Sequence, residues 1–206
     1  MFSLSGLITF TTLISTIIAA PTSPKNKAVG SNTVPLNGLP SPSGLTLKYI
    51  GLGIGTQNYT CPNTTVSPIA VGAVASLYDA TYLSQAKSKA SIPTLPALAF
   101  STGSSMGLPT LGHHYFTVSG TPTFHLEAAQ PAPLVLSAKK VASVPAPALS
   151  VPNSVDWLYL TDDGKGISEG LKAVYRVETA GGKAPSTCSK VGDIQVKYAA
   201  EYWFYA

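Results

Sequence analysis

The residues best suited to chemistry are the three histidines of the chain, His113, His114 and His125, which lie close together around one turn signal. If Gly120-Thr121 forms a two-residue hairpin loop, the flanking strands place His114 opposite Glu127, with His125 on the same face. Two imidazoles and a carboxylate could bind a divalent metal ion or act as general acid and base, with His113 as a further candidate. The alternative is a set of polar strand residues with local hydrogen bonds, because a register slip of one residue turns every side chain to the other face.

A second candidate is the only arginine of the chain, Arg176. Alternate side chains of a strand share a face, so Glu178 is expected on the same side as Arg176. This spacing predicts an ion pair between the two residues. The alternative is that Arg176 binds a ligand.

Four aromatic residues could bind sugars, because flat apolar rings stack well on the C–H groups of a pyranose. They are Trp157, Tyr159, Trp203 and Tyr205. The alternative is that these rings belong to the core, which is the more common place for aromatic residues in β proteins.

Two glycine motifs fail the tests for known catalytic or cofactor loops. Gly51–Thr56 lacks the third glycine of a dinucleotide loop and has no βαβ unit around it. Gly103–Gly107 has the spacing of a nucleophile elbow, but Pro109 opposes the helix that must follow. The sequence therefore indicates no cofactor except a possible divalent metal, and it favours a protein without catalytic activity.

The N-terminus predicts export. Leu7–Ile18 is an apolar run that ends at Ala19-Ala20, as in a secretory signal peptide spanning 1–20. The run is too short for a comfortable membrane span, and no later stretch is long and apolar enough. We therefore expect a secreted, extracellular protein with no membrane contact after cleavage.

In an exported protein, two cysteines could form a disulfide and two Asn-X-Thr sequences could be glycosylated. An even pair, Cys61 and Cys188, predicts a disulfide in a secreted chain, with two buried free thiols as the alternative. Asn58 and Asn63 each begin an Asn-X-Thr sequence, so both are candidate glycosylation sites.

Composition excludes several classes of protein. The chain has 206 residues, of which 45% are hydrophobic and 11% charged, so it is not a charge-rich disordered protein. The net charge is +4, but no basic run exceeds the Lys139-Lys140 pair, which argues against nucleic-acid binding.

The pattern along the chain predicts an all-β fold. Residues 21–44 are rich in Pro, Ser, Asn and Lys and are expected to form a flexible arm. Residues 45–206 contain short apolar or alternating runs with regular turn signals, which indicate one sandwich or barrel-like domain with short helical insertions. Ala97–Phe100 is expected as a strand and Ala80–Ala90 as the main helix.

Six stretches together resemble an uncharacterised secreted family of fungi and bacteria, catalogued as domain of unknown function 3455. They are Gly55–Cys61, Leu77–Asp79, Gly112–Phe116, Val155–Leu160, Val174–Cys188 and Val196–Tyr205. The resemblance implies an extracellular, mostly β domain with Cys61 and Cys188 at the two cysteine positions of the family. It transfers no catalytic residues. The label malate dehydrogenase, which fungal members often carry, is not supported, because the dinucleotide loop and an arginine set for a dicarboxylate are missing.

Two functions are consistent with these residues. The first is a non-enzymatic protein of the cell wall or host interface that binds glycans through its aromatic residues. The second is a metal protein or enzyme that uses His114, His125 and Glu127.

Overall fold

The computed structural model describes Met1 and residues 33–85, 94–148 and 150–206. Apart from Met1, the expected signal peptide lies outside these ranges, as does most of the second half of the expected helix Ala80–Ala90. Among the described residues, no helix has the length and apolar character needed to cross a membrane.

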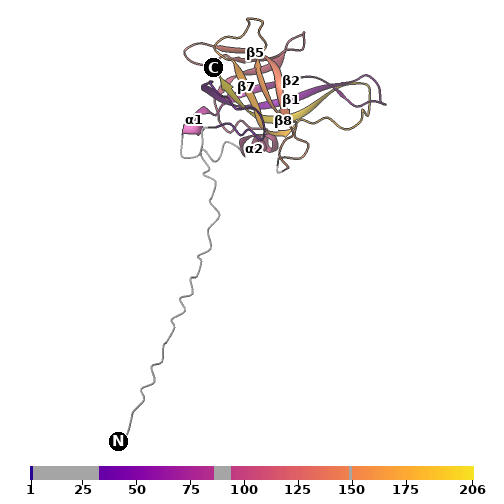
Figure 1. Cartoon of the computed structure of the whole chain (residues 1–206). Coiled ribbons are helices and arrows are strands. Elements are labelled where there is room, and N and C mark those ends of the chain that lie inside the picture. Colours follow the sequence, from indigo (N-terminus) through magenta and orange to yellow (C-terminus); the bar gives the residue numbers. More distant parts are fainter. Residues whose placement is uncertain (2–32, 86–93, 149) are drawn as a thin grey trace.

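Eight antiparallel strands form a closed barrel in which each strand pairs with the next along the chain (Figure 1). Pairing of the first strand with the last closes the barrel. The mostly β fold class predicted above is confirmed, and of its two forms the barrel is correct. The strands are β1 (Leu47–Cys61), β2 (Ile69–Asp79), β3 (Thr110–Phe116), β4 (Pro122–Leu126), β5 (Leu134–Val144), β6 (Trp157–Asp162), β7 (Ala173–Gly181) and β8 (Gly192–Tyr205).

Two short helices, α1 (Thr81–Gln85) and α2 (Leu95–Thr102), lie between β2 and β3. The strand expected at Ala97–Phe100 is therefore wrong, because these residues form the central half of α2. Pro96 stands in the first turn of α2, and Gly103 ends it in a left-handed conformation. A short apolar run fits a buried strand and a buried helix equally well, so only its flanking residues distinguish the two.

The barrel interior is filled by side chains from seven strands, β2 to β8. On β8, Tyr198, Ala200, Tyr202 and Phe204 point inward and are fully buried. The bulk of these rings is accommodated by the glycines of β1, because a Cβ at Gly53 would collide with the ring of Tyr202. The glycine-rich stretch is thus a strand.

A second cluster covers the outer face of β1 and β6 to β8, and we call it the outer wall cluster. It contains Ile50, Leu52, Trp157, Tyr175, Val177, Trp203 and Tyr205, together with residues of α2 and Val34 and Leu39. The hydroxyl of Tyr175 donates to the carbonyl of Pro40 at 2.8 Å. The described end of the expected flexible arm therefore packs against the barrel.

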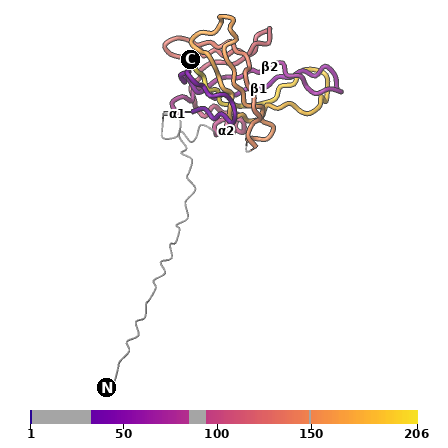
Figure 2. The backbone as a smooth tube through the Cα atoms, viewed as in Figure 1, coloured from indigo at the N-terminus to yellow at the C-terminus, as the bar shows by residue number. Residues whose placement is uncertain are grey.

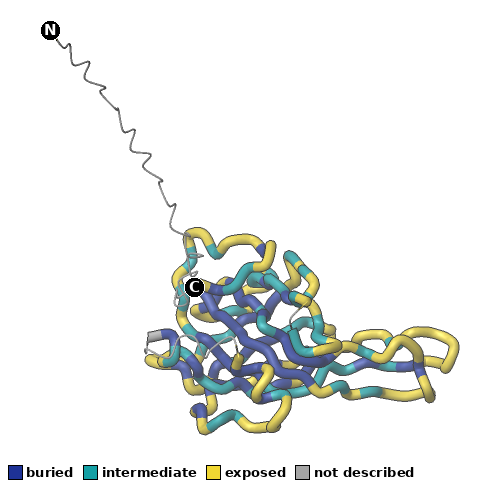
Figure 3. The backbone as a smooth tube through the Cα atoms, turned by 90° about the horizontal axis from the view of Figure 1, so that it is seen from below, coloured by how far each residue is buried: buried dark blue, intermediate teal, exposed yellow. Residues whose placement is uncertain are grey.

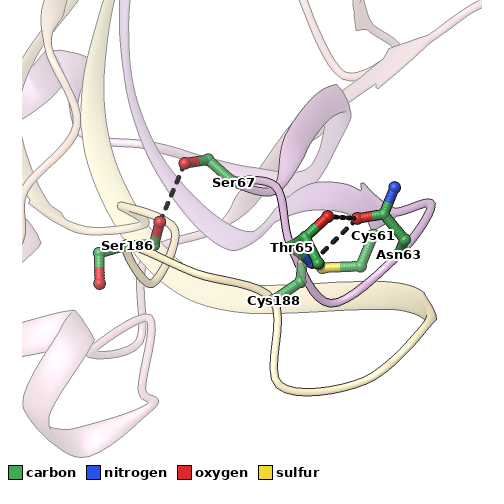
Figure 4. Close-up of a disulfide and its surroundings, with 6 residues drawn as sticks. All are labelled: Cys61, Asn63, Thr65, Ser67, Ser186 and Cys188. Atoms are coloured by element: carbon green, nitrogen blue, oxygen red, sulfur yellow. Dashed lines mark hydrogen bonds between the residues drawn. A yellow bond between two sulfur atoms is a disulfide. The ribbon is translucent and has the colours of Figure 1, made fainter.

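A three-stranded extension projects from one side of the barrel, built from the end of β1, the start of β2 and the start of β8 (Figures 1 and 2). Most of its residues are half-buried or exposed, whereas buried residues concentrate in the barrel (Figure 3). The disulfide Cys61–Cys188 joins the end of β1 to the segment before β8 (Figure 4), which confirms the predicted pairing. The hydroxyl of Ser67 donates to the Ser186 carbonyl beside it.

Candidate functional site

The hairpin that carries the histidines has a different register from the one expected. His113 pairs with His125, and His114 pairs with Phe124. Residues 117–121 form the loop, in which the Thr117 hydroxyl accepts from the backbone N–H of Thr121 at 3.1 Å. Because the loop is longer than the expected two residues, the register changes by an odd number and the predicted cluster of His114, His125 and Glu127 is wrong.

His113 takes the place of His114 in a cluster on the outside of the barrel. The Nδ1 atoms of His113 and His125 lie 3.1 Å and 3.2 Å from the same carboxylate oxygen of Glu127. All three side chains are well exposed. Within the ranges described, no three His, Cys, Asp or Glu side chains are placed to hold a metal ion. This arrangement is that of polar strand residues with local hydrogen bonds.

His114 points into the barrel and is buried. Its ring stacks on Phe124 with centroids 4.2 Å apart, and its Nδ1 lies 2.9 Å from the carbonyl of Thr123. Burial lowers the pKa of His114 to about 4, so the ring is neutral at neutral pH. A neutral ring beside a carbonyl donates from Nδ1, which leaves Nε2 as an acceptor.

The aromatic residues expected to stack on sugars are not available for it. Trp157, Trp203 and Tyr205 are at most 4% exposed and belong to the outer wall cluster. Tyr159 is half-buried and stacks on Tyr175 with centroids 4.5 Å apart. These rings belong to the core, as the alternative interpretation predicted, because α2 and the segment before β1 cover this face of the barrel.

The expected ion pair between Arg176 and Glu178 is not formed in the described structure, so this prediction is wrong. A β-bulge lies between Val177 and Ala180, and Glu178 has a left-handed backbone with φ 47°. The bulge breaks the alternation that placed the two side chains on one face. Burial raises the pKa of Glu178 to about 7.

Arg176 instead lies at the open end of the barrel, in a cavity of about 470 Å³ that we call the mouth. Its Nη2 donates to the backbone carbonyl of Asp156 at 2.8 Å, and its buried Nε has no acceptor in good hydrogen-bonding geometry, although the side chain also interacts with the Tyr202 hydroxyl. The buried amide nitrogen of Gln57, which also lines the mouth, likewise has no well-aligned acceptor, although its side chain interacts with the Tyr198 hydroxyl. Lys140 and Lys183 line the mouth with exposed side chains.

Two tyrosine hydroxyls lie beside Gln57 and Arg176 and interact with these side chains. Tyr198 and Tyr202 share a hydrogen bond of 2.6 Å between their hydroxyl oxygens, and both are completely buried. Burial raises the pKa of both phenols, and the nearby charge of Arg176 lowers it in part. Both hydroxyls therefore stay protonated at neutral pH, and Arg176 remains a cation without a compensating phenolate.

Sequence reasoning identified Arg176 as a possible ligand residue but missed Gln57, Lys140, Lys183, Tyr198 and Tyr202. One signal was present: Gly51, Gly53 and Gly55 leave one face of β1 without side chains. A bare face in a strand indicates bulky neighbours across it. That signal could have assigned Tyr198 and Tyr202 to the interior.

The family model described as Protein of unknown function (DUF3455) matches residues 42–206. Neither the curated proteins nor the solved structures contain a significant match to the chain.

Proposed function

The chain belongs to the family described as Protein of unknown function (DUF3455), and from that premise we propose that it is an extracellular binding protein that holds a small organic anion in the mouth of its barrel. A sugar acid from a cell-wall or host glycan is one member of this class of ligand.

The observation that carries the proposal is the uncompensated charge of Arg176. No ion pair joins it to a carboxylate among the described residues, its buried Nε–H has no acceptor in good geometry, and its side-chain interaction with Tyr202 involves a neutral hydroxyl. A cation that is partly removed from water is costly unless an anion accompanies it, and buried N–H groups are nearly always hydrogen-bonded. An anionic ligand would supply both the charge and the acceptor.

The type of cation also supports a carboxylate ligand. The planar guanidinium of arginine matches a carboxylate with two parallel N–H donors, whereas a lysine offers a point charge. The Asp156 carbonyl holds one end of the Arg176 guanidinium in place. Lys140 and Lys183 would draw anions towards the mouth, while Asp156, whose carboxylate accepts from Ser143 at 3.0 Å, is the one acidic residue of its lining.

Secretion is part of the proposal and is supported by two features. The apolar run Leu7–Ile18 has the character of a signal peptide, and disulfides persist mainly in oxidising compartments. Glycosylation follows from export. Asn63 is exposed in the extension and accepts hydrogen bonds from the backbone N–H and hydroxyl of Thr65 (Figure 4), whereas Asn58 is half-buried within β1.

An NMR titration with sodium benzoate, glucuronate and citrate, against sodium chloride, tests the proposal. We expect at least one carboxylate to shift the amide signals of residues around Gln57 and Arg176. The Arg176→Gln variant should lose this response, and Lys172→Gln should keep it, because Lys172 is exposed outside the mouth and carries the same charge. Shifts that persist in Arg176→Gln, or no shifts with any carboxylate, would overturn the proposal.

A further inference from the structure

The mouth narrows at Arg176 into a small inner cavity of about 30 Å³, which has His114, Phe124 and Tyr202 among its lining residues. A cavity of this size has room for only one or two water molecules, since each needs about 10–15 Å³ by this measure. A ligand held by Arg176 therefore cannot extend deeper into the barrel. The rest of the ligand must lie in the mouth, between Arg176 and solvent.

The walls of the mouth differ in polarity. Phe116 and Pro122, which pair across β3 and β4, line it together with Leu158 and Leu160 of β6. These four side chains also border the inner cavity together with Arg176. The rest of the lining is mostly polar and includes Gln57, Tyr59, Lys140, Ser143, Ser154, Asp156 and Lys183. The hydroxyls of Tyr59 and Ser143 already donate, to the Gly182 carbonyl at 2.7 Å and to the Asp156 carboxylate at 3.0 Å.

A polyol ligand fits this lining poorly. Its many hydroxyls would lose water against Phe116, Pro122, Leu158 and Leu160 without gaining partners there, and each unpaired hydroxyl that is buried carries a cost. An apolar ligand body would instead remove both its own surface and these side chains from water.

The geometry points to an amphipathic monocarboxylate, with an aromatic or branched aliphatic body, whose carboxylate pairs with Arg176 and whose body lies against Phe116 and Leu158. This inference rests on the proposed function and adds the class of anion. It excludes sugar acids and inorganic anions as the preferred ligands.

Three probes, tested on the unmodified protein, separate the need for a negative charge on the ligand from the need for an apolar body. In 3-phenylpropanoate, charge and apolar body are both present; 3-phenylpropanamide keeps the body without the charge, and glucuronate keeps the charge without the apolar body. Isothermal titration should show that 3-phenylpropanoate binds at least about tenfold more tightly than either of the others, since each lacks one of the two interactions.

Two variants test which residue binds the apolar body of the ligand and which binds its carboxylate. Leu158→Ser should weaken binding of 3-phenylpropanoate and leave glucuronate unchanged, whereas Arg176→Gln should weaken both. Unchanged thermal unfolding of Leu158→Ser would show that the barrel is intact, and the comparison of probes on the unmodified protein stands without any variant.

The outcomes distinguish this inference from the proposed function. If glucuronate binds as tightly as 3-phenylpropanoate and depends on Arg176, the inference is overturned and the proposed function stands. If 3-phenylpropanamide binds as tightly as the acid, the mouth does not select anions and both fail. If none of the three probes binds, the inference is overturned, and the proposed function stands only if benzoate or citrate gives the NMR response that depends on Arg176.

Discussion

Glu201 is a carboxyl group that the fold buries completely, at 1% exposure. Its Oε2 accepts from the indole N–H of Trp203 at 2.8 Å, and its Oε1 has no partner. Burial, together with the neighbouring Glu178, raises the pKa of Glu201 to about 8. The pKa of Glu178 is itself raised to about 7 by burial. Both groups are therefore neutral in mildly acidic solution, where the folded barrel buries no charge at these positions.

These two carboxyls contribute stability that is present in acid and lost in base. Buried His114, with its pKa lowered from 6.5 to about 4, acts in the opposite direction, but its shift is smaller than the two carboxyl shifts together, so the protein should be more stable in acid than in base. A folded-state pKa above the unfolded value of 4.5 means that the native state binds the proton more tightly. The stabilisation is complete below about pH 4.5 and is lost as the pH rises through about 7 for Glu178 and about 8 for Glu201. Each unit of pKa difference corresponds to about 1.4 kcal/mol.

Urea unfolding between pH 4.5 and 9 checks this. The free energy of unfolding should fall with pH in the native protein and fall much less in Glu201→Gln, which carries no charge at any pH. Glu169→Gln, at an exposed glutamate, should keep the native slope. Stability that rises towards pH 9, or a Glu201→Gln slope equal to the native one, would contradict the assignment.

The barrel depends on the contact between β1 and β8. Gly53 of β1 lies under the ring of Tyr202, which is completely buried and cannot move aside. Gly53→Ala should therefore lower the free energy of unfolding by about 1–3 kcal/mol, the usual cost of overpacking a core.

A double-mutant cycle isolates that contact. In the Tyr202→Leu background the added methyl has room, so Gly53→Ala should cost less there than in the native protein. An equal cost in both backgrounds, measured by chemical unfolding, would show that the strain arises elsewhere on β1.

Part of this fold can be predicted from the sequence. The alternation of apolar and polar residues and the turn residues predict the β class and most of the strands, because these signals are local. The strand expected at Ala97–Phe100 failed, since its apolar run is too short to show a period. The predicted register of the histidine hairpin is wrong because its loop spans residues 117–121. A hydrogen bond from the Thr121 N–H to the Thr117 hydroxyl stabilises this loop, and the composition of the loop does not reveal it.

The candidate site was predictable only in part, and for the same reason. Arg176 stood out as the only arginine, but its partner was assigned by strict alternation, which the bulge between Val177 and Ala180 interrupts. Trp157 and Trp203 are predicted from sequence to stack on sugars, with burial in the core as the alternative, and their actual burial depends on α2 and the segment before β1. Such contacts join residues far apart in the sequence, and no local pattern encodes them.

The charge that prepares the mouth to bind an anion also destabilises the folded protein when no anion is bound. The barrel holds the charge of Arg176 without a carboxylate partner among the described residues, and such a site lowers the stability of the ligand-free protein. An anion that binds only the folded barrel would restore stability by mass action, by about 2.7 kcal/mol at a concentration of 100 times Kd.

Arg176→Met tests this opposition, because methionine fills similar space without charge. Without ligand, the variant should unfold with a free energy equal to or above that of the native protein, since the charge no longer has to be desolvated and the losses are limited to the bond to the Asp156 carbonyl and the interaction with the Tyr202 hydroxyl. With 3-phenylpropanoate, the native protein should gain thermal stability and Arg176→Met should not. Lys172→Met serves as the control and should gain as the native protein does. A loss of more than about 2 kcal/mol in ligand-free Arg176→Met, beyond the usual cost of one hydrogen bond, would show instead that Arg176 holds the barrel together.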